Sequence, residues 1–429
     1  MPTMTLVLGG LVGVLYIFGV PIAVSLGLGA IFALTFFSPV PTMQIIPQLF
    51  SDAATSFVLL AVPLFILAGF LMEKGTVGKN LVDFALSIVG WTTGGLANAG
   101  IVSSMIFGGI SGSSLADTAT FGTILVPQMV QDGYPEDYAT AVVLNSSTLA
   151  VVIPPSILMV LAAASTDQSV GKALAGGLIP GIFITLCLLA INIYLCRKRG
   201  FGGKVRFSVP NVWRTFLRSW TALIAPLIIL GTIFSGVVTP TEGAAVAVLY
   251  VILIDYFIFR KLTLSDIRSA VTKAAYLTAA ILFIVTSTAI ANWILAYDNV
   301  PKYLGAALAF LPGGKVSFLL IMDVILLLIG MTIDATPACI IFTPLFLPMA
   351  RSFGIDPTHF IVIMVCGLAL GLATPPYGVC LFSMASITGL PMDRIIRQSI
   401  PFYLAILLAL MAITFFPPLS LAFPTLIGL

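Results

Sequence analysis

Two apolar stretches of this chain, 221 residues apart, contain glycines and prolines in the same order. Five positions recur at this one offset: Gly109, Pro127, Gly133, Pro154 and Pro155 in the first stretch match Gly330, Pro348, Gly354, Pro375 and Pro376 in the second. The chain is therefore predicted to contain an internal repeat. Polar, Gly- and Pro-rich interruptions at corresponding places in two apolar halves are typical of the substrate and ion site of a secondary transporter.

The composition shows which solvent such a chain needs. Hydrophobic residues make up 59% of the 429 residues and charged residues 8%, and the mean hydropathy is +1.16. One soluble core cannot bury so much apolar surface, so we predict an all-α, polytopic membrane protein with a lipid bilayer around it. The chain has a single histidine, His359, and five cysteines without a CxxC pair. This set of residues does not indicate a zinc site, a disulfide framework or Ser-His or Cys-His catalysis.

Apolar segments of about membrane length can be placed between glycines, prolines and charges. Two further apolar regions, 94–130 and 314–350, are too long for one span and are interrupted by GGISGSS and GMTIDATP. Each of these is either two spans or one re-entrant hairpin, and a short surface helix is expected ahead of each, at 77–91 and 300–311. The expected spans are 4–19, 21–38, 54–72, 136–165, 171–196, 219–236, 243–259, 274–297, 357–386 and 394–418, of which 136–165 and 357–386 are broken by proline pairs.

The placement of basic residues indicates an orientation. The loop 197–218 contains seven basic residues and no acid, which predicts that it is cytoplasmic. If each interrupted region is a hairpin that returns to its own side, each half has five full spans and the two halves cross the membrane in opposite senses. Both termini would then lie outside. The predicted organisation is a first inverted repeat over 1–197, a basic cytoplasmic linker over 198–218 and a second inverted repeat over 219–429.

The interruptions supply the residues that are suited to bind a cation. A hairpin tip at membrane depth exposes backbone groups that lipid cannot satisfy, and a proline pair leaves upstream carbonyls without amide donors. Hydroxyl and carbonyl oxygens are hard ligands, appropriate to sodium, whereas nitrogen and sulfur ligands are absent from these clusters. An alternative is that the small polar residues only permit close helix packing. The predicted sodium ligands are Ser113, Ser114, Asn145, Ser146, Thr148, Gly330, Thr332, Asp334, Gly371 and Thr374.

The same geometry favours an anionic substrate. New half-helices should begin near Leu115, Pro155, Ala335 and Pro376, and helix N-termini carry partial positive charge and unpaired N–H groups. The predicted substrate contacts are Ser111, Gly112, Ser113, Ser147, Pro154, Pro155, Thr336, Pro375 and Pro376.

The acids near the interruptions are assigned separately. Asp117 is either an ion ligand or a helix cap. Asp334, inside the second tip, is expected to bind a cation or carry a proton, because an intramembrane acid is costly without a partner. Asp323 has no visible role.

At these motifs the chain resembles the large membrane subunit of TRAP transporters, the tripartite ATP-independent periplasmic family. The motifs are GGISGSSLADTA at 108–119, IPPS at 153–156 and TPPYG at 374–378, and the resemblance covers nearly the whole chain. It implies an elevator-type importer of organic acids that is driven by sodium and lies in a bacterial cytoplasmic membrane, with both termini periplasmic. It also implies a periplasmic substrate-binding protein and a small four-helix membrane subunit, here expected as a separate polypeptide because no further four-helix block precedes Leu429. No other cofactor and no nucleic acid are expected.

Three other functions are alternatives to the one that this resemblance implies. A solitary ion-coupled carrier of organic anions would work without a binding protein. An ion channel would need filter repeats around a common axis, whereas two inverted halves are predicted around a site. Tyr297-Asp298 resembles one half of the motif of an intramembrane aspartyl protease. The protease is disfavoured, because the other half, GxGD, is missing. We therefore expect no enzymatic activity, and the sequence does not identify the substrate acid.

Overall fold

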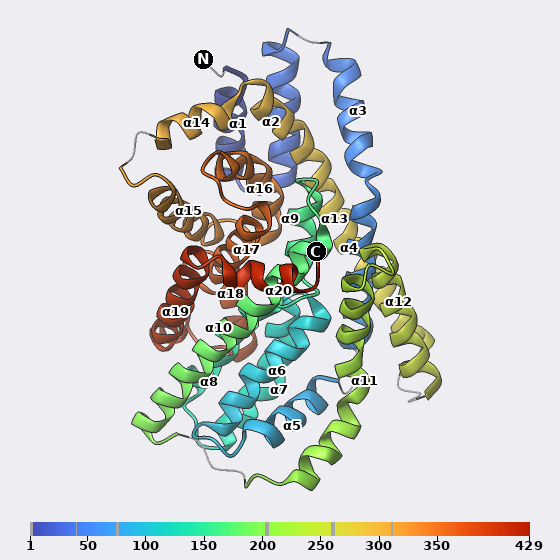
Figure 1. The fold of residues 1–429 in the computed structure, drawn as a ribbon, viewed down its shortest axis with the longest axis vertical. Coiled ribbons are helices and arrows are strands. Elements are labelled where there is room, and N and C mark those ends of the chain that lie inside the picture. The colour runs from blue at the N-terminus through green and yellow to red at the C-terminus, as the bar shows by residue number, and fades with distance from the viewer. Residues whose placement is uncertain (1–2, 40, 74–76, 202–205, 259–261, 310–311) are drawn as a thin grey trace.

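Backbone N–H and C=O groups in a bilayer must bond within their own segment, and this chain meets that demand with helices. The computed structural model describes residues 3–39, 41–73, 77–201, 206–258, 262–309 and 312–429, and within these ranges it contains helices and turns but no strand (Figure 1). The prediction of an all-α fold is confirmed. The protein is a multi-pass membrane protein.

The helices of the first half follow one another with short connections. They are α1 Thr3–Ile17, α2 Ile22–Phe37, α3 Thr42–Ala54, η1 Phe57–Leu60, α4 Ala61–Glu73, α5 Val77–Val89, α6 Gly95–Ser111, α7 Ser114–Gln131, α8 Glu136–Ser147, η2 Thr148–Val151, α9 Ile157–Ala164 and α10 Val170–Arg199. Those of the second half are α11 Val209–Phe234, α12 Pro240–Ile252, η3 Leu253–Ile258, α13 Leu264–Tyr297, α14 Val300–Ala309, α15 Lys315–Gly330, α16 Ala335–Ser352, α17 Pro357–Ala373, α18 Val379–Thr388, α19 Met392–Phe415 and α20 Pro418–Leu426.

The two interrupted regions are helical hairpins. Helices α6 and α7 pack together and are separated by Gly112 and Ser113, and α15 and α16 are separated by residues 331–334. Each hairpin is preceded by a short helix, α5 or α14, and followed by a helix broken at a proline pair, α8/η2/α9 or α17/α18. The two halves therefore use these elements in the same order, with the α6/α7 hairpin and the α15/α16 hairpin in opposite parts of the molecule (Figure 1).

The expected spans differ in length from the helices that form. Within the described residues, four helices are long and apolar enough to cross a membrane unaided, namely α10, α11, α13 and α19, and the bent pair of α3 and the η1–α4 segment could supply a fifth. Helices α1 and α2 have 15 and 16 residues, about 22–24 Å at 1.5 Å per residue. Apolar runs such as 4–19 and 21–38 thus overstate helix length, because glycines and prolines at their ends stop the helix before the apolar run ends.

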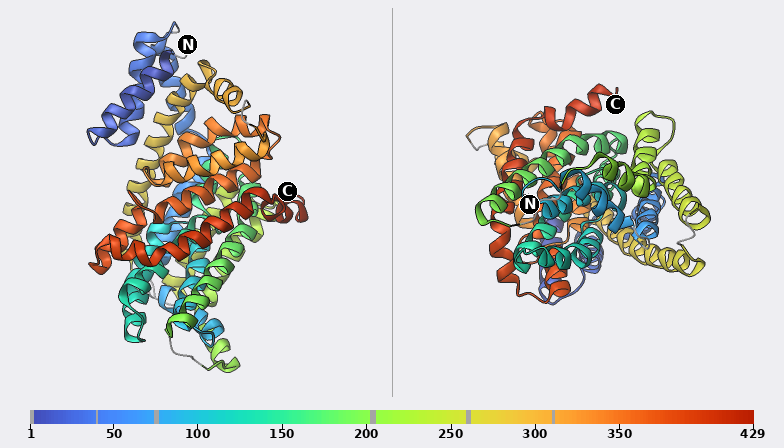
Figure 2. Two further views of the ribbon diagram at one scale, coloured as in Figure 1. Left: turned by 90° about the vertical axis from the view of Figure 1, so that its left-hand side faces the viewer. Right: turned by 90° about the horizontal axis from the view of Figure 1, so that it is seen from below.

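The predicted linker 198–218 is also different. Helix α10 continues to Arg199, and α11 begins at Val209, ten residues before the expected span, with Pro210 in its first turn. The beginning of α11 packs on α5, where Ser219 donates to the Asn80 carbonyl at 2.9 Å. The basic stretch is therefore largely helical, and Lys204 lies outside the described residues. This basic stretch lies at the opposite end of the molecule from α1 and α2 (Figures 1 and 2).

Helix α13 lies between the N-terminal helices and the second hairpin. Its 34 residues contact α2, α3, α4 and α16, and a small core of α1, α2 and α13 side chains covers its C-terminal half. A polar contact fixes its end, since Asp298 accepts hydrogen bonds from the backbone and hydroxyl of Thr5, each at 2.8 Å. The larger core surrounds the two broken helices. The first is buried through its break, whereas in the second α17 is buried and Pro376 and Tyr377 at the break are exposed.

Candidate functional site

The first hairpin tip is built by a glycine turn and a serine cap. Gly112 ends α6 with a left-handed φ of 60°, and its amide donates to the Gly108 carbonyl at 2.9 Å. Ser113 then caps α7, because its hydroxyl accepts from the Ala116 amide at 3.3 Å. A Cβ on Gly112 would lie 3.0 Å from the Pro155 carbonyl oxygen. Glycine thus permits both the turn and the close approach of this tip to the first broken helix.

The first broken helix passes beside that tip. Helix α8 ends at Ser147, a 3₁₀ turn covers 148–151, and α9 begins at Ile157 after Pro154 and Pro155. Ser156 caps α9 by accepting from the Met159 amide at 3.3 Å. The half-helix therefore begins two residues after the second proline, near Pro155 as expected.

The second tip uses an aspartate where the first uses a serine. Asp334 caps α16, with Oδ1 accepting from the Thr336 amide at 2.9 Å. The adjacent broken helix ends α17 at Ala373, continues through Pro375 and Pro376 and resumes in α18 at Val379. Its Tyr377 amide donates to the Met331 carbonyl of the tip at 2.9 Å. Both proline pairs contain a cis peptide bond.

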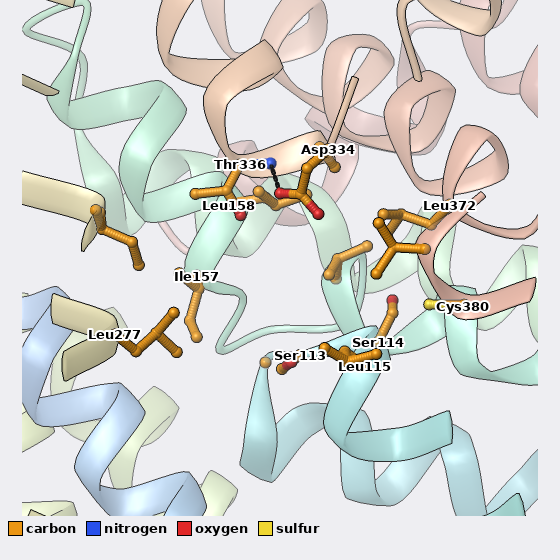
Figure 3. A pocket seen from close by; sticks show the side chains of 15 residues that line it. Ser113, Ser114, Leu115, Ile157, Leu158, Leu277, Asp334, Thr336, Leu372 and Cys380 are labelled. Atoms are coloured by element: carbon orange, nitrogen blue, oxygen red, sulfur yellow. Dashed lines mark hydrogen bonds between the residues drawn. The ribbon is translucent and has the colours of Figure 1, made fainter. Parts of the chain in front are cut away.

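The two tips face each other across one cavity of about 170 Å³, called the tip cavity here (Figure 3). Ser113 and Ser114 approach it from one side and Asp334 and Thr336 from the other. Its remaining wall is mostly apolar. The lining residues are Gly112, Ser113, Ser114, Leu115, Val151, Ile157, Leu158, Leu277, Ile281, Asp334, Ala335, Thr336, Leu372, Val379 and Cys380.

Four helix N-termini meet at this cavity. Residues of the first turn of α7, α9, α16 and α18 all line it. The first-turn amides of a helix have no intrahelical partners, and its dipole places partial positive charge there. No lysine or arginine is among the lining residues. The tip cavity can therefore hold an anion through helix dipoles and hydroxyls, with the Asp334 carboxylate available to a cation beside it.

The structure brings together five of the residues predicted from sequence. Gly112, Ser113, Ser114, Asp334 and Thr336 line the tip cavity. Four others are buried at the end of α8, where each side chain donates to a carbonyl three or four residues earlier: Asn145, Ser146, Ser147 and Thr148. The remaining nine are not among the residues that line the cavity. Ser111, Pro154, Pro155, Gly330, Gly371 and Thr374 are buried, Pro375 is half-buried, and Thr332 and Pro376 are exposed.

Comparison with known proteins identifies the family. Residues 9–419 match the model of the DctM component of tripartite ATP-independent periplasmic transporters. The chain is 36% identical over 413 residues to the C4-dicarboxylate TRAP transporter large permease protein DctM of Pseudomonas aeruginosa, covering 94% of this chain and 95% of that one. The chain belongs to the TRAP transporter large-subunit family. It is also 35% identical to the isethionate TRAP transporter permease protein DctMQ of Oleidesulfovibrio alaskensis, covering 96% of this chain and 65% of that protein.

A solved structure shares the fold. The Alcanivorax borkumensis YdaH transporter aligns with a TM-score of 0.59 over 88% of this chain and 89% of its own, at 18% identity. At that identity the likeness concerns the arrangement of helices alone. The TRAP family assignment rests on the sequence matches, which are to components of membrane transporters.

In this TRAP subunit each tip is held by a backbone contact that needs small residues. A Cβ on Gly108 would lie 2.5 Å from Cα of Ala150, and one on Gly371 would lie 2.4 Å from Cα of Gly330. Ala150 and Gly371 are related by the same 221-residue offset as the prolines. In both halves, then, the end of the hairpin's first helix touches the backbone of the broken helix just before its proline pair.

A buried polar cluster lies behind the first tip. Ser104 donates to Asp117 Oδ1 at 2.8 Å and contacts Ser146 Oγ at 3.2 Å. Asp117 is therefore not the helix cap that its position suggested, because Ser113 caps α7. Three buried oxygens here have no hydrogen-bond partner among the described residues: Ser114 Oγ, Asp117 Oδ2 and Asn145 Oδ1. Unpaired buried oxygens are costly unless an ion, a proton or water satisfies them.

Sequence reasoning missed the apolar side of the tip cavity. Leu277 and Ile281 of α13, which is neither a hairpin nor a broken helix, line the cavity. Leu277 is seen on one side of it and Cys380, from the start of α18, on another (Figure 3). Cys380 follows the TPPYG motif by two residues and could have been included on that ground. Residues 279–285 of α13 are apolar without interruption, so the sequence there does not show which side of the helix faces a cavity.

Asp323, the other acid without an assigned role, has a hydrogen-bond donor. Asp323 of α15 is buried and accepts from the Thr414 hydroxyl at 3.1 Å. The Thr414 carbonyl in turn lies 3.2 Å from His359 Nε2, whose Nδ1 lies 2.6 Å from Ser420 Oγ. These contacts join α15, α17, α19 and α20 and give Asp323 and His359 a structural setting away from the tip cavity.

Proposed function

We propose that this chain is the membrane permease of a sodium-coupled importer of an organic acid. The observation that carries the proposal is the convergence of four helix N-termini, two hairpin tips and one carboxylate on the tip cavity. A carboxylate or sulfonate group suits the helix N-termini, and the hydroxyl and carboxylate oxygens suit sodium. A cation bound next to the anion reduces the cost of removing both from water.

The relatives support this choice of substrate class. The names of two of them refer to C4-dicarboxylate and isethionate, both small organic anions. Among the described residues that line the tip cavity there is no cationic side chain that would select one particular acid. We infer that the substrate is a small organic acid, and that a periplasmic binding protein contributes to selecting it.

The mechanism that we propose is an elevator. The hairpins and broken helices form one unit with polar residues at its centre, and this unit carries the tip cavity. Helix α13 and the N-terminal helices provide an apolar wall against which the unit can move. The two halves, with equivalent elements at a 221-residue offset, would be inverted repeats that alternate in opening the cavity to each side. The permease would lie in a bacterial cytoplasmic membrane with both termini periplasmic.

The partners follow from the family. The matched model describes a component of a tripartite transporter. We propose a small four-helix membrane subunit as one partner, and the longer relative named DctMQ is compatible with fusion of that subunit to the permease in some members. The periplasmic binding protein would be the other partner.

The test is uptake of labelled organic acids into proteoliposomes that contain this chain and its small subunit. Uptake is measured with and without an inward sodium gradient and with and without the binding protein. The proposal expects uptake that requires both. Uptake that persists without the binding protein would indicate a solitary carrier, and uptake that ignores sodium would refute the coupling.

A further inference from the structure

A second cavity, of about 250 Å³, is lined by two aspartates and, among the residues that the structure describes, by no basic side chain. We call it the acidic cavity. Asp52, near the end of α3, and Asp167, just after α9, stand at it together with four neutral polar side chains. The lining residues are Asp52, Ala53, Ser56, Leu59, Leu161, Ala164, Ser165, Asp167, Val285, Thr288, Ala289, Asn292 and Ile340.

Three helices, α9, α13 and α16, line both the tip cavity and the acidic cavity. On α13, Leu277 and Ile281 line the tip cavity, and Val285, Thr288 and Asn292 line the acidic cavity, at spacings of three or four residues that keep them on one helix face. Helices α9 and α16 also contribute to both cavities. Along α13 the two sets are about 6 Å apart, from Ile281 to Val285.

The boundary between the two cavities is apolar. Leu158 and Ile281 belong to the tip cavity, whereas Leu161 and Val285 belong to the acidic cavity. Leu158, Leu161 and Ile281 are buried. An ion in the acidic cavity is therefore held back from the tip cavity until these side chains separate, because an apolar constriction is costly for a charge to enter.

One residue that lines the acidic cavity has a buried hydroxyl without a hydrogen-bond partner among the described residues. Thr288 is only 1% exposed and lines the cavity, and its Oγ1 has no hydrogen bond to any described residue. A buried hydroxyl without a partner costs free energy unless a ligand or water satisfies it. This observation is independent of the two carboxylates.

The charges at this cavity determine what could occupy it. Two exposed carboxylates, with no lysine or arginine among the described lining residues, attract cations and repel carboxylates, so the cavity does not suit the organic acid. Neutral oxygens from Ser56, Ser165, Thr288 and Asn292 add hard ligands. The volume exceeds that of a bare ion and leaves room for water around it.

We propose that the acidic cavity is a binding site for a hydrated monovalent cation, which waits there before it enters the tip cavity. The site is lined by the end of α3, and α3 lies in the opposite part of the molecule from the basic end of α10 and the beginning of α11 (Figure 1). The identity of the ion as the coupling sodium rests on the proposed function. The affinity of the cavity for cations does not depend on that function.

The test compares uptake as a function of external sodium at constant ionic strength, with choline as the replacement cation. The variant is Asp52→Asn/Asp167→Asn in the reconstituted permease with its small subunit and binding protein. Removing both charges should raise the sodium concentration for half-maximal uptake about threefold to tenfold and change the rate at saturating sodium less than about twofold. Thr288→Val should shift the half-maximal concentration in the same direction. Asp132→Asn, at an exposed aspartate that ends α7, is the matched control and should not shift it.

Direct binding of ²²Na⁺ to the solubilised complex separates the two proposals. Weaker binding in the double variant than in the Asp132→Asn control supports the acidic cavity, even if wild-type uptake ignores sodium and the proposed function fails. Equal binding and equal half-maximal concentrations in the double variant, Thr288→Val and the control would overturn the cation site, whatever the result for sodium coupling. Gel filtration of each variant shows whether it is folded.

Discussion

The contact between Gly371 and Gly330 provides a quantitative prediction for Gly371→Ala. The added Cβ would lie 2.4 Å from Cα and the carbonyl carbon of Gly330 and 2.7 Å from its oxygen. Carbon atoms rest at about 3.5–4.0 Å, so the end of α15 and the last turn of α17 must separate by about 1 Å. Both partners are backbone, which cannot rotate away as a side chain could.

The expected cost combines two opposing effects. Overpacking costs about 1–3 kcal/mol, and alanine in place of glycine in a helix returns up to about 1 kcal/mol. We expect a net loss of about 1–2 kcal/mol in the free energy of unfolding, measured by SDS titration in mixed micelles. Because Gly330 adjoins the second tip, its displacement should also raise the sodium concentration for half-maximal uptake, about tenfold if the tip loses about 1.4 kcal/mol of ion binding.

The control for this prediction is Gly231→Ala. Gly231 lies within α11, and a Cβ there would meet nothing within 4 Å, so only the favourable helix propensity remains. Its free energy of unfolding should be unchanged or higher by up to about 1 kcal/mol. A Gly371→Ala protein with the stability and sodium dependence of the wild type would refute the reasoning that this contact fixes the tip.

Three further predictions concern the first and second tips. Asp334→Asn should keep the cap of α16, since asparagine also caps helices, but should raise the half-maximal sodium concentration at least about tenfold in uptake assays. Gly112→Ala should lower the free energy of unfolding by about 1–2 kcal/mol, because its φ of 60° disfavours a side chain and its Cβ would approach Pro155. Ser104→Ala should cost about 1–3 kcal/mol in the same titration, because it removes the donor to the buried Asp117 carboxylate.

Each of these has its own control. Gly133→Ala has a φ of 89° but nothing within 4 Å of its Cβ, so it isolates backbone strain from the contact at Gly112. A smaller loss for Gly112→Ala than for Gly133→Ala would contradict the contact. Ser103→Ala removes a buried hydroxyl that bonds only to its own helix, and a loss equal to that of Ser104→Ala would argue against a special role for the Asp117 contact. Unchanged sodium dependence in Asp334→Asn would exclude this carboxylate as an ion ligand.

The interruptions of this fold could be located from sequence because their causes are local. Glycine at a positive φ, a serine or aspartate cap and a proline pair act within a few residues, so GGISGSS, GMTIDATP and the two proline pairs marked the tips and breaks within a few positions. Helix lengths were less predictable. Lipid tolerates apolar residues equally inside and beyond a helix end, so the extent of an apolar run does not fix the extent of the helix.

The sequence by itself determined that the chain is an all-α membrane protein and that two polar interruptions at one offset belong together. Only the tertiary structure decided which oxygens share a cavity. Ser113 and Asp334 line the tip cavity, whereas Asn145 and Ser147 are buried among the helices. In the sequence all four are polar residues at or near the interruptions. The wall supplied by α13 was equally hidden, because the side of an apolar helix that faces a cavity depends on what packs around it, and no local preference encodes that choice.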